Sequence, residues 1–239
     1  NYEFDKAIDK FEFYSNFLAE NNWDDKRANN RRIRQAKYAK SLFENPVEVD
    51  IVPIKHINTD YAEYRPKLNA EENIMYFTSK RPGGSSDILD DQGEYYEDIY
   101  ISKKKMGVWT EPQLVNDLIN TTESSSCLYL SPDGEHMFLS MVNNDQKLGH
   151  LGRGIYEARL DGNHWNNPEF LDQKVNSKYW ETYASLDIYG NVLFFVSDRE
   201  GGYGGRDIWM IKRLPNGEWA DPQNLGEPIN TEYDEESPY

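Results

Sequence analysis

Residues 163–177 read Asn163-His-Trp165-Asn-Asn-Pro168-Glu-Phe-Leu-Asp-Gln-Lys-Val175-Asn176-Ser177, and this stretch decides the fold because both its parts recur. Its first part, Gly or Asn two places before Trp with Pro three places after, recurs as Gly107-Val-Trp109-Thr-Glu-Pro112 and Gly217-Glu-Trp219-Ala-Asp-Pro222. The tryptophans are 56 and 54 residues apart. Its second part, a β-branched residue followed by Asn and a hydroxyl residue, recurs as Ile57-Asn58-Thr59, Ile119-Asn120-Thr121 and Ile229-Asn230-Thr231. From residue 51 onward the chain is therefore an internal repeat.

Two further markers keep the same phase. An apolar run begins 17 residues after the repeated Asn, at Met75-Tyr76-Phe77, Met137-Phe138-Leu139 and Leu193-Phe194-Phe195. Another strand-like run follows, at Asp98-Ile99-Tyr100, Gly154-Ile155-Tyr156 and Asp207-Ile208-Trp209. Turn signals such as Ser131-Pro-Asp-Gly134 separate these runs. Short strands in an aromatic-rich unit of about 50 residues predict a β-propeller blade, because one small sheet cannot bury both its faces alone.

The predicted fold class is mainly β, with three full four-stranded blades of an incomplete ring, preceded by a short α-helical hairpin. Residues 233–239 begin a fourth unit. Propellers close with roughly four to eight blades. The missing blades would follow Tyr239, be disordered or come from another chain. We favour the first alternative and expect the sequence to be a piece of a longer polypeptide.

Charge and periodicity predict three parts: a helical hairpin at 1–46, a linker with the first strand at 47–62, and a partial propeller at 63–239. Residues 1–46 carry a net charge of +1 and the rest carries −17. Apolar residues at three-and-four spacing predict one helix from Phe4 to Leu18 and a second over 24–43. The spacing of Ala7 and Phe11 resembles the second helix of a tetratricopeptide (TPR) repeat.

The second predicted helix is rich in arginine, with Arg27, Arg31, Arg32 and Arg34 in eight residues. One interpretation is a solvated face. The other is a basic docking face for an acidic surface, either this chain's own −17 region or a partner.

Composition excludes several classes of function. With 42 acidic and 26 basic residues, the net charge of −16 repels nucleic-acid phosphates and anionic lipid. No run of about 18 apolar residues is present, so we expect no transmembrane segment. The single cysteine, Cys127, excludes an internal disulfide and a four-cysteine zinc site.

The units resemble the WD40-like (TolB-type) propeller repeat. The residues that carry this resemblance are Ser131-Pro132-Asp133-Gly134, Leu193-Phe194-Phe195, Ser197-Asp198-Arg199-Glu200-Gly201-Gly202 and Asp207-Ile208-Trp209. Together with the Trp-x-x-Pro and Ile-Asn-Thr links, the layout is similar to Bacteroidetes OmpA-family proteins that carry TPR-like helices, including the PorE-like branch associated with type IX secretion. Two units depart from the pattern, at Lys80-Arg81-Pro82 and at Met141-Val-Asn-Asn144.

The resemblance implies a periplasmic, outer-membrane-associated protein that binds other envelope proteins. Peptidoglycan contact would come only through a domain not present in this sequence.

No motif for catalysis, cofactor binding or metal binding stands out, and we expect none of the three. The sequence contains no Gly-x-Ser-x-Gly elbow, and its four histidines form neither His-x-His nor HExxH. We interpret the glycine-rich run from Gly201 to Asp207 as a turn.

One set of carboxylates stands in the register of the repeat. Glu63, Glu181 and Glu235 each follow the repeated Asn by five residues, with Ser125 in the second unit. One interpretation makes them hydrogen-bond acceptors that hold one blade to the next. The other places a negative ring in the channel, as a candidate binding site for a basic tail, peptide or cation. We expect the repeated Asn to form turns at the blade junctions and the repeated Trp to pack between blades.

The sequence therefore favours a non-catalytic scaffold or protein-binding module of the bacterial cell envelope. The alternative is a fragment of a glycan-binding or glycan-processing propeller enzyme.

Overall fold

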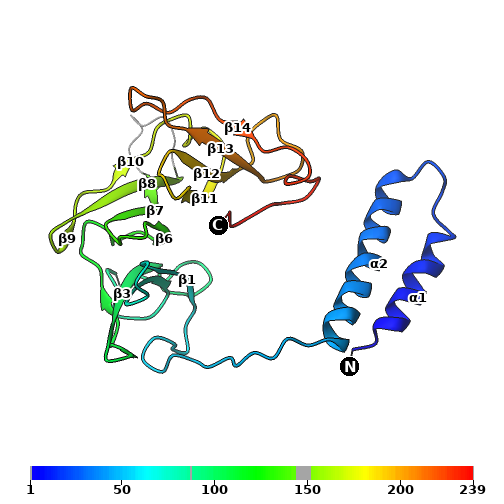
Figure 1. Cartoon of the computed structure of the whole chain (residues 1–239), viewed down its shortest axis with the longest axis horizontal. Helices are drawn as coiled ribbons and strands as arrows, with labels where there is room; N and C mark the ends of the chain where they lie inside the picture. The colour runs from blue at the N-terminus through cyan, green and yellow to red at the C-terminus, as the bar shows by residue number, and fades with distance from the viewer. Residues whose placement is uncertain (1, 87, 144–151, 239) are drawn as a thin grey trace. The chain divides into compact units, whose positions relative to one another are not determined.

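The computed structural model describes residues 2–86, 88–143 and 152–238, so Asn144 and His150 lie outside the described residues. The chain divides into two compact units, residues 1–52 and 53–239, and the boundary falls inside the predicted linker (Figure 1). The fold is mainly β and of the β-propeller type, with a helical hairpin ahead of the strands. Within the described residues, neither helix is long and apolar enough to cross a membrane.

The first unit is a hairpin of α1 (Phe4–Ser15) and α2 (Trp23–Glu44). Asn22 caps α2 because its side chain accepts a hydrogen bond from the Asp25 N–H at 3.2 Å. The two helices are joined by ion pairs from Lys37 to Glu12 and from Lys40 to Asp5. The predicted first helix extended to Leu18, but α1 ends at Ser15.

The apolar pattern of the hairpin is only partly buried. Ile8 is the one buried residue of α1, and Tyr14 is 44% exposed. In α2 the buried residue is polar: the Asn29 side chain donates to the Phe11 carbonyl and to Ser15 Oγ of α1, both at 2.8 Å. Two helices cannot enclose a core, which explains why most of the predicted inward positions keep contact with water.

The second unit contains three antiparallel sheets that follow one another in chain order (Figure 1). Each contains four strands in up-and-down order, which is the blade that the repeat predicted, and the first two sheets have a fifth, two-residue strand in addition. The strands are β1 (Glu63–Leu68), β2 (Ile74–Ser79), β3 (Asp98–Lys105) and β5 (Gln113–Leu114) in the first blade; β6 (Ser125–Leu130), β7 (His136–Asn143), β8 (Gly152–Asp161) and β10 (Glu169–Phe170) in the second; and β11 (Glu181–Leu186), β12 (Val192–Ser197), β13 (Asp207–Lys212) and β14 (Gln223–Asn224) in the third.

The repeated tryptophans lie on short extra strands that the sequence analysis did not predict. β4 (Val108–Trp109) extends β3 and β9 (His164–Trp165) extends β8, and the third blade has a single bridge between Arg213 and Trp219 at the same place. Each pairing turns the chain back over the end of the third strand. The indole is thereby directed toward the neighbouring hydrophobic cluster.

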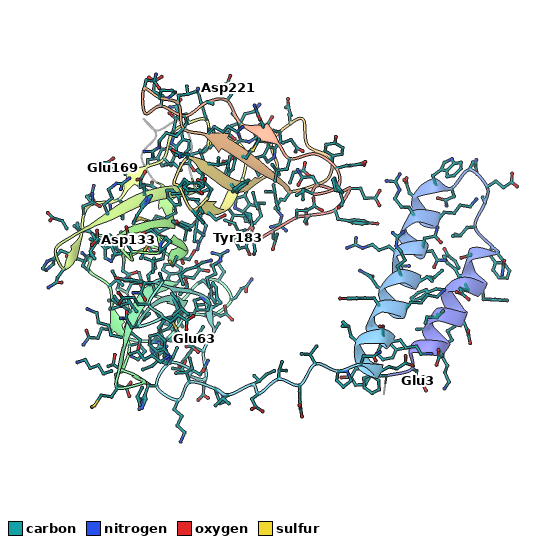
Figure 2. The ribbon with its side chains drawn as sticks, viewed as in Figure 1. Glu3, Glu63, Asp133, Glu169, Tyr183 and Asp221 are labelled. Carbon is teal, nitrogen blue, oxygen red and sulfur yellow. The ribbon has the colours of Figure 1, made fainter. Side chains whose placement is uncertain are left out.

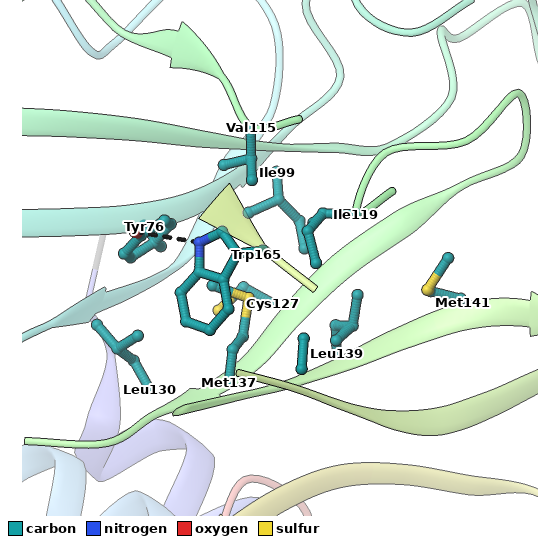
Figure 3. Packing of buried hydrophobic residues seen from close by; sticks show 11 residues of the cluster. Tyr76, Ile99, Val115, Ile119, Cys127, Leu130, Met137, Leu139, Met141 and Trp165 are labelled. Atoms are coloured by element: carbon teal, nitrogen blue, oxygen red, sulfur yellow. Dashed lines mark hydrogen bonds between the residues drawn. The ribbon is translucent and has the colours of Figure 1, made fainter. Parts of the chain in front are cut away.

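Hydrophobic cores lie between the blades rather than inside them. One cluster joins Tyr76, Ile99, Val115 and Ile119 of the first blade to Cys127, Met137, Leu139 and Trp165 of the second (Figure 3). Within it, the Trp165 indole N–H donates to the Tyr76 hydroxyl at 3.3 Å. A second cluster joins Phe138 and Ile155 to Phe195, Trp209 and Trp219 of the third blade.

The expectation that Trp packs between blades is confirmed for Trp165 and Trp219, which are 3% and 6% exposed. Trp109 instead packs on the cluster that covers the free face of the first blade, together with Ile54 and Ile57 from the incoming chain. This face has no preceding blade in the structure, so the incoming segment covers it.

The repeated Asn residues fasten each blade to the link that leaves it. The Asn176 side chain accepts from the Ile155 N–H and donates to the carbonyls of Ile155 and Leu171, at 2.8 to 2.9 Å. Asn120 makes the same three bonds to Ile99 and Val115. Both are 2% exposed, so the amide satisfies backbone groups that water cannot reach. The junction role predicted for them is confirmed, although the side chain binds strands rather than forming only a turn.

Candidate functional site

Glu181 lies at the start of β11, deeply buried among donors. Its carboxylate accepts from the Ser177 N–H at 3.0 Å, from Ser177 Oγ at 2.5 Å and from Ser197 Oγ at 2.9 Å. Arg199 completes the set, with Nη2 3.1 Å from Glu181 Oε1. The exposed fractions of the two side chains are 1% and 9%. Burial of a carboxylate is tolerable here because a cation and several hydrogen bonds compensate it.

Arg199 also holds the chain that enters the blade. Its guanidinium donates to the carbonyls of Lys174 and Val175 at 2.8 and 2.7 Å, and its Nε donates to Ser197 Oγ at 3.0 Å. The guanidinium carbon lies 4.7 Å from the Phe195 ring centre. Glu181, Ser197 and Arg199 thus form a unit, here called the clasp, that ties the blade junction to the end of β12.

The first blade contains the same clasp. Glu63 accepts from Thr59 N and Oγ1, from Ser79 Oγ and from Arg81, which also donates to the Ile57 carbonyl at 2.7 Å. The Glu63 side chain is 7% exposed. Arg81 therefore takes the place of Arg199 although Pro82 follows it.

The other two repeats carry incomplete clasps. In the second blade Ser125 stands opposite Met141 where the other blades pair Glu with Ser, and Ser125 Oγ is buried with no hydrogen-bond partner within the described residues. The Glu235 carboxylate accepts from Thr231 N and Oγ1, as that of Glu181 does from Ser177, but no Ser or Arg side chain of the described residues bonds to it.

These contacts give Glu63 and Glu181 arginine partners and hydrogen bonds, as the first interpretation expected. The structure does not bring Glu63, Glu181 and Glu235 together into one cluster. A role of the three in partner binding stays a prediction.

A different set of side chains spans the inner strands, two residues beyond the clasp carboxylates. Arg65 of β1 donates from Nη1 to Ser126 Oγ of β6 at 2.9 Å. The Arg65 guanidinium carbon also lies 4.5 Å from the ring centre of Tyr183 on β11, so one cation contacts all three blades. Figure 2 labels Glu63 and Tyr183 on the first and third blades.

Backbone strain marks the same positions. β1 and β11 each have a bulge here, and the non-glycine residues Arg65 and Tyr183 have φ of 53° and 49°. Ser237, at the same distance after Glu235, has φ of 57°. Side chains other than glycine rarely adopt this region, and such strain persists where the surrounding structure holds it. The sequence analysis missed these residues, although the register of the repeated Glu would have located them.

A hollow of 540 Å³ opens where the three inner strands end, and we call it the cup. Its apolar walls come from all three blades: Pro66 and Leu68, Leu130 and Pro132, Leu186 and Ile188. Lys67 and Ser185 are among its polar lining residues. Its volume falls within the range of small-ligand sites.

The surroundings of Lys67 shift the pKa of its side chain. Burial, the largest cause, lowers the pKa of Lys67 from its ordinary value, and the nearby Arg65 lowers it further. Tyr183 and Cys127 act in the opposite direction. Arg65, Lys67 and Tyr183 therefore lie close enough to interact electrostatically beside the cup.

The arginines of α2 do not all share one face. Positions 27, 31 and 34 fall on one side of the helix at about 100° per residue, and Arg32 turns away from them. Arg27, Arg32 and Arg34 are exposed and Arg31 is partly buried. Trp23 and Tyr38, which are 72% and 68% exposed, lie on the same face as Arg27, Arg31 and Arg34. A docking role for this face stays a prediction.

The described residues contain no group of three or more His, Cys, Asp or Glu side chains that could hold a metal ion. The described lining of the cup includes neither His nor Cys.

No protein-family model matches the chain, and no curated protein matches it by sequence. Among solved structures it is similar to a protein assigned as TolB from Agrobacterium tumefaciens, at 12% identity and a TM-score of 0.39, over 71% of this chain and 63% of that one. It is also similar to a post-proline cleaving enzyme from Rickettsia typhi, at 13% identity and a TM-score of 0.38, over 67% of this chain and 21% of that one. The chain thus spans about a fifth of the length of the post-proline cleaving enzyme and less than two thirds of the length of the TolB protein.

Proposed function

We propose that this chain is a non-catalytic binding module of the bacterial cell envelope, which holds a protein partner on the inner-strand side of its propeller unit. The cup carries this proposal. It is built from all three blades and its walls are largely apolar. A hollow of this kind suits the binding of apolar side chains of a partner.

The envelope location rests on the resemblance of the repeat to TolB-type propellers in the order of Ser-Pro-Asp-Gly, Ser-Asp-Arg and Asp-Ile-Trp motifs. Within this location we propose a periplasmic, outer-membrane-associated protein of the OmpA-family layout. Attachment to a type IX secretion complex is the most specific form of the proposal.

The test is capture of envelope proteins by the immobilised chain, compared between two variants. Leu68→Glu places a carboxylate in the wall of the cup, where the side chain is 42% exposed. Met106→Glu adds the same charge at a fully exposed turn outside the cup. We expect a protein from the periplasmic and outer-membrane fraction to be retained by the native chain and by Met106→Glu, and lost with Leu68→Glu.

Equal retention by all three proteins would contradict a binding role for the cup. Turnover of a glycan or peptide by the purified chain would contradict the non-catalytic assignment and favour the alternative of a propeller enzyme.

A further inference from the structure

Asp207, at the start of β13, has a buried carboxylate oxygen without a partner. The residue is 1% exposed. Its Oδ2 accepts from the Tyr203 N–H at 2.6 Å and from the Asn224 side-chain amide at 3.3 Å. Its Oδ1 is buried and has no hydrogen-bond partner within the described residues. A buried anionic oxygen of this kind is costly, so a compensating group is expected beside it.

The first blade contains such a group at the equivalent position. Asp98 is the counterpart of Asp207, and the Ser85 N–H donates to its Oδ2 as the Tyr203 N–H does in the third blade. The Ser85 hydroxyl oxygen then lies 2.6 Å from Asp98 Oδ1 and within hydrogen-bond distance of the Thr121 carbonyl oxygen. In the third blade Tyr203 replaces Ser85, and its side chain is 54% exposed.

The link that leaves the third blade repeats the register of the link that leaves the first. The Ile208 N–H donates to Asn230 Oδ1 at 2.9 Å, and the Ile99 N–H donates to Asn120 Oδ1 at 2.7 Å. The residue that follows Asn230 is Thr231, the counterpart of Thr121. Its carbonyl oxygen is therefore carried to the same side of the blade.

Gly204 shows independently that this carbonyl reaches the loop beside Asp207. A Cβ at Gly204 would lie 2.5 Å from the Thr231 carbonyl oxygen, so the loop after Tyr203 lies directly against it. Within the described residues the Thr231 carbonyl accepts no hydrogen bond. Two oxygen acceptors, Asp207 Oδ1 and the Thr231 carbonyl, thus stand where the first blade places a hydroxyl between them.

The surrounding charge favours a cation at this position. Residues 232–236 contain four carboxylates, and Arg206 forms its ion pairs with Asp234 and Glu236 rather than with Asp207. A water molecule would supply hydrogen bonds to Asp207 but no compensating charge.

Calcium suits the two oxygens. It binds carboxylate and carbonyl oxygens at about 2.3–2.6 Å and accepts water as its other ligands. The distance of 2.6 Å from Ser85 Oγ to Asp98 Oδ1 shows that the equivalent position in the first blade lies within this range.

We infer that the third blade binds a calcium ion between Asp207 Oδ1 and the Thr231 carbonyl oxygen, with water as the remaining ligands. The ion ties β13 to the link at residues 231–236, as the Ser85 hydroxyl ties β3 to the link after the first blade. Only one protein ligand is a side chain, so a search of the sequence for metal-binding motifs could not detect the site. This inference is independent of the proposed function, because it concerns the stability of the blade and not the cup.

The experiment measures the melting temperature of the full chain after treatment with EDTA and dialysis. Calcium is added to about 5 mM, above the Kd range of about 10⁻⁴–10⁻³ M that is typical of weak extracellular sites. Magnesium and sodium chlorides at equal ionic strength are the comparators. We expect calcium to raise the melting temperature by at least about 3 °C, because an ion that binds only the folded chain stabilises it. Magnesium should raise it less, since it gives up its water reluctantly.

The first pair of variants tests the carboxylate. Asp207→Asn keeps the size of the side chain and removes its charge, and we expect the calcium-dependent shift to disappear. Asp98→Asn is the matched control in the first blade, where Ser85 supplies the hydroxyl, and it should keep the full shift.

The second pair exchanges the ion for the hydroxyl of the first blade. Tyr203→Ser places a hydroxyl at the position that Ser85 has beside Asp98, and we expect this variant to melt at the same temperature with and without calcium. Tyr203→Ala removes the ring without adding a hydroxyl and should keep the full shift.

A melting temperature that calcium raises no more than sodium does would overturn the inference, since the position would then belong to water. A calcium shift that survives Asp207→Asn would overturn it as well. If circular dichroism shows that Asp207→Asn does not fold, the Tyr203 pair decides, because equal shifts in Tyr203→Ser and Tyr203→Ala would place the ion elsewhere.

Discussion

The clasp contains a buried carboxylate, Glu181, whose cation is Arg199, so single substitutions can test it. Removing Arg199 leaves the Glu181 carboxylate, which is 1% exposed, without its cation. We expect Arg199→Met to lower the free energy of unfolding by about 3–5 kcal/mol, the usual cost of leaving a buried charge uncompensated. Urea unfolding followed by tryptophan fluorescence measures this cost.

The double variant separates charge from packing. Glu181→Gln together with Arg199→Met removes both charges, and we expect its loss to be smaller than the sum of the two single losses. The second blade shows that an uncharged version of this site exists, since Ser125 and Met141 occupy it. Lys212→Met, an exposed change in the same blade, is the control. Strictly additive losses would contradict the clasp as a coupled unit.

Cys127 gives a second residue-scale prediction because it is the only thiol in the chain. It is 0% exposed in the core between the first two blades, and burial raises the pKa of its thiol to about 12. The thiolate is the reactive form, so at pH 8 the folded protein holds almost none of it. We expect Ellman's reagent to label Cys127 only after unfolding in guanidinium chloride. Rapid labelling of the native protein would show that the interblade core opens.

At the scale of elements, the Asn junction joins two strands and the link that leaves them. Asn176→Ala removes three hydrogen bonds and takes the side-chain partner from the buried Ile155 N–H and Leu171 carbonyl, while the Ile155 carbonyl keeps its bond from the Leu171 N–H. We expect a loss of about 2–4 kcal/mol in unfolding free energy, because each buried polar group left unpaired costs about 1–3 kcal/mol. Asn216→Ala, in an exposed turn of the third blade, should change stability by less than about 0.5 kcal/mol. Equal losses in the two variants would contradict the junction role.

Elements also show what the sequence could and could not predict. The strands at residues 74–79, 136–143 and 192–197 follow from apolar runs of fixed phase, since each run fills a core that recurs with the blade. The short strands that carry Trp109 and Trp165 did not follow, because two-residue strands have no periodicity to detect. The bulges at Arg65 and Tyr183 shift the register by one residue, so side-chain alternation could not predict which residues span the inner strands.

For the whole molecule, the position of the hydrophobic cores predicts where a protease will cut the chain. All three hydrophobic clusters of the propeller unit draw their residues from Ile54 onward. The segment before it is unprotected: Val47, Val49, Ile51 and Val52 are 67–90% exposed and belong to no helix or strand. Exposed backbone of this kind is where proteases cut first.

Limited proteolysis with elastase should therefore cleave within residues 47–52 and release a stable fragment that begins near Pro53. We expect this fragment to keep the near-ultraviolet circular dichroism of its five tryptophans, because Trp23 is the only tryptophan outside it. Its melting temperature should lie within about 2 °C of that of the uncut chain, since no residue of its three cores has been removed. Two results would mean that the cores between blades do not suffice to hold the three sheets together. One is cleavage inside a blade at an earlier time than cleavage within residues 47–52, and the other is loss of the tryptophan signal when the fragment is released.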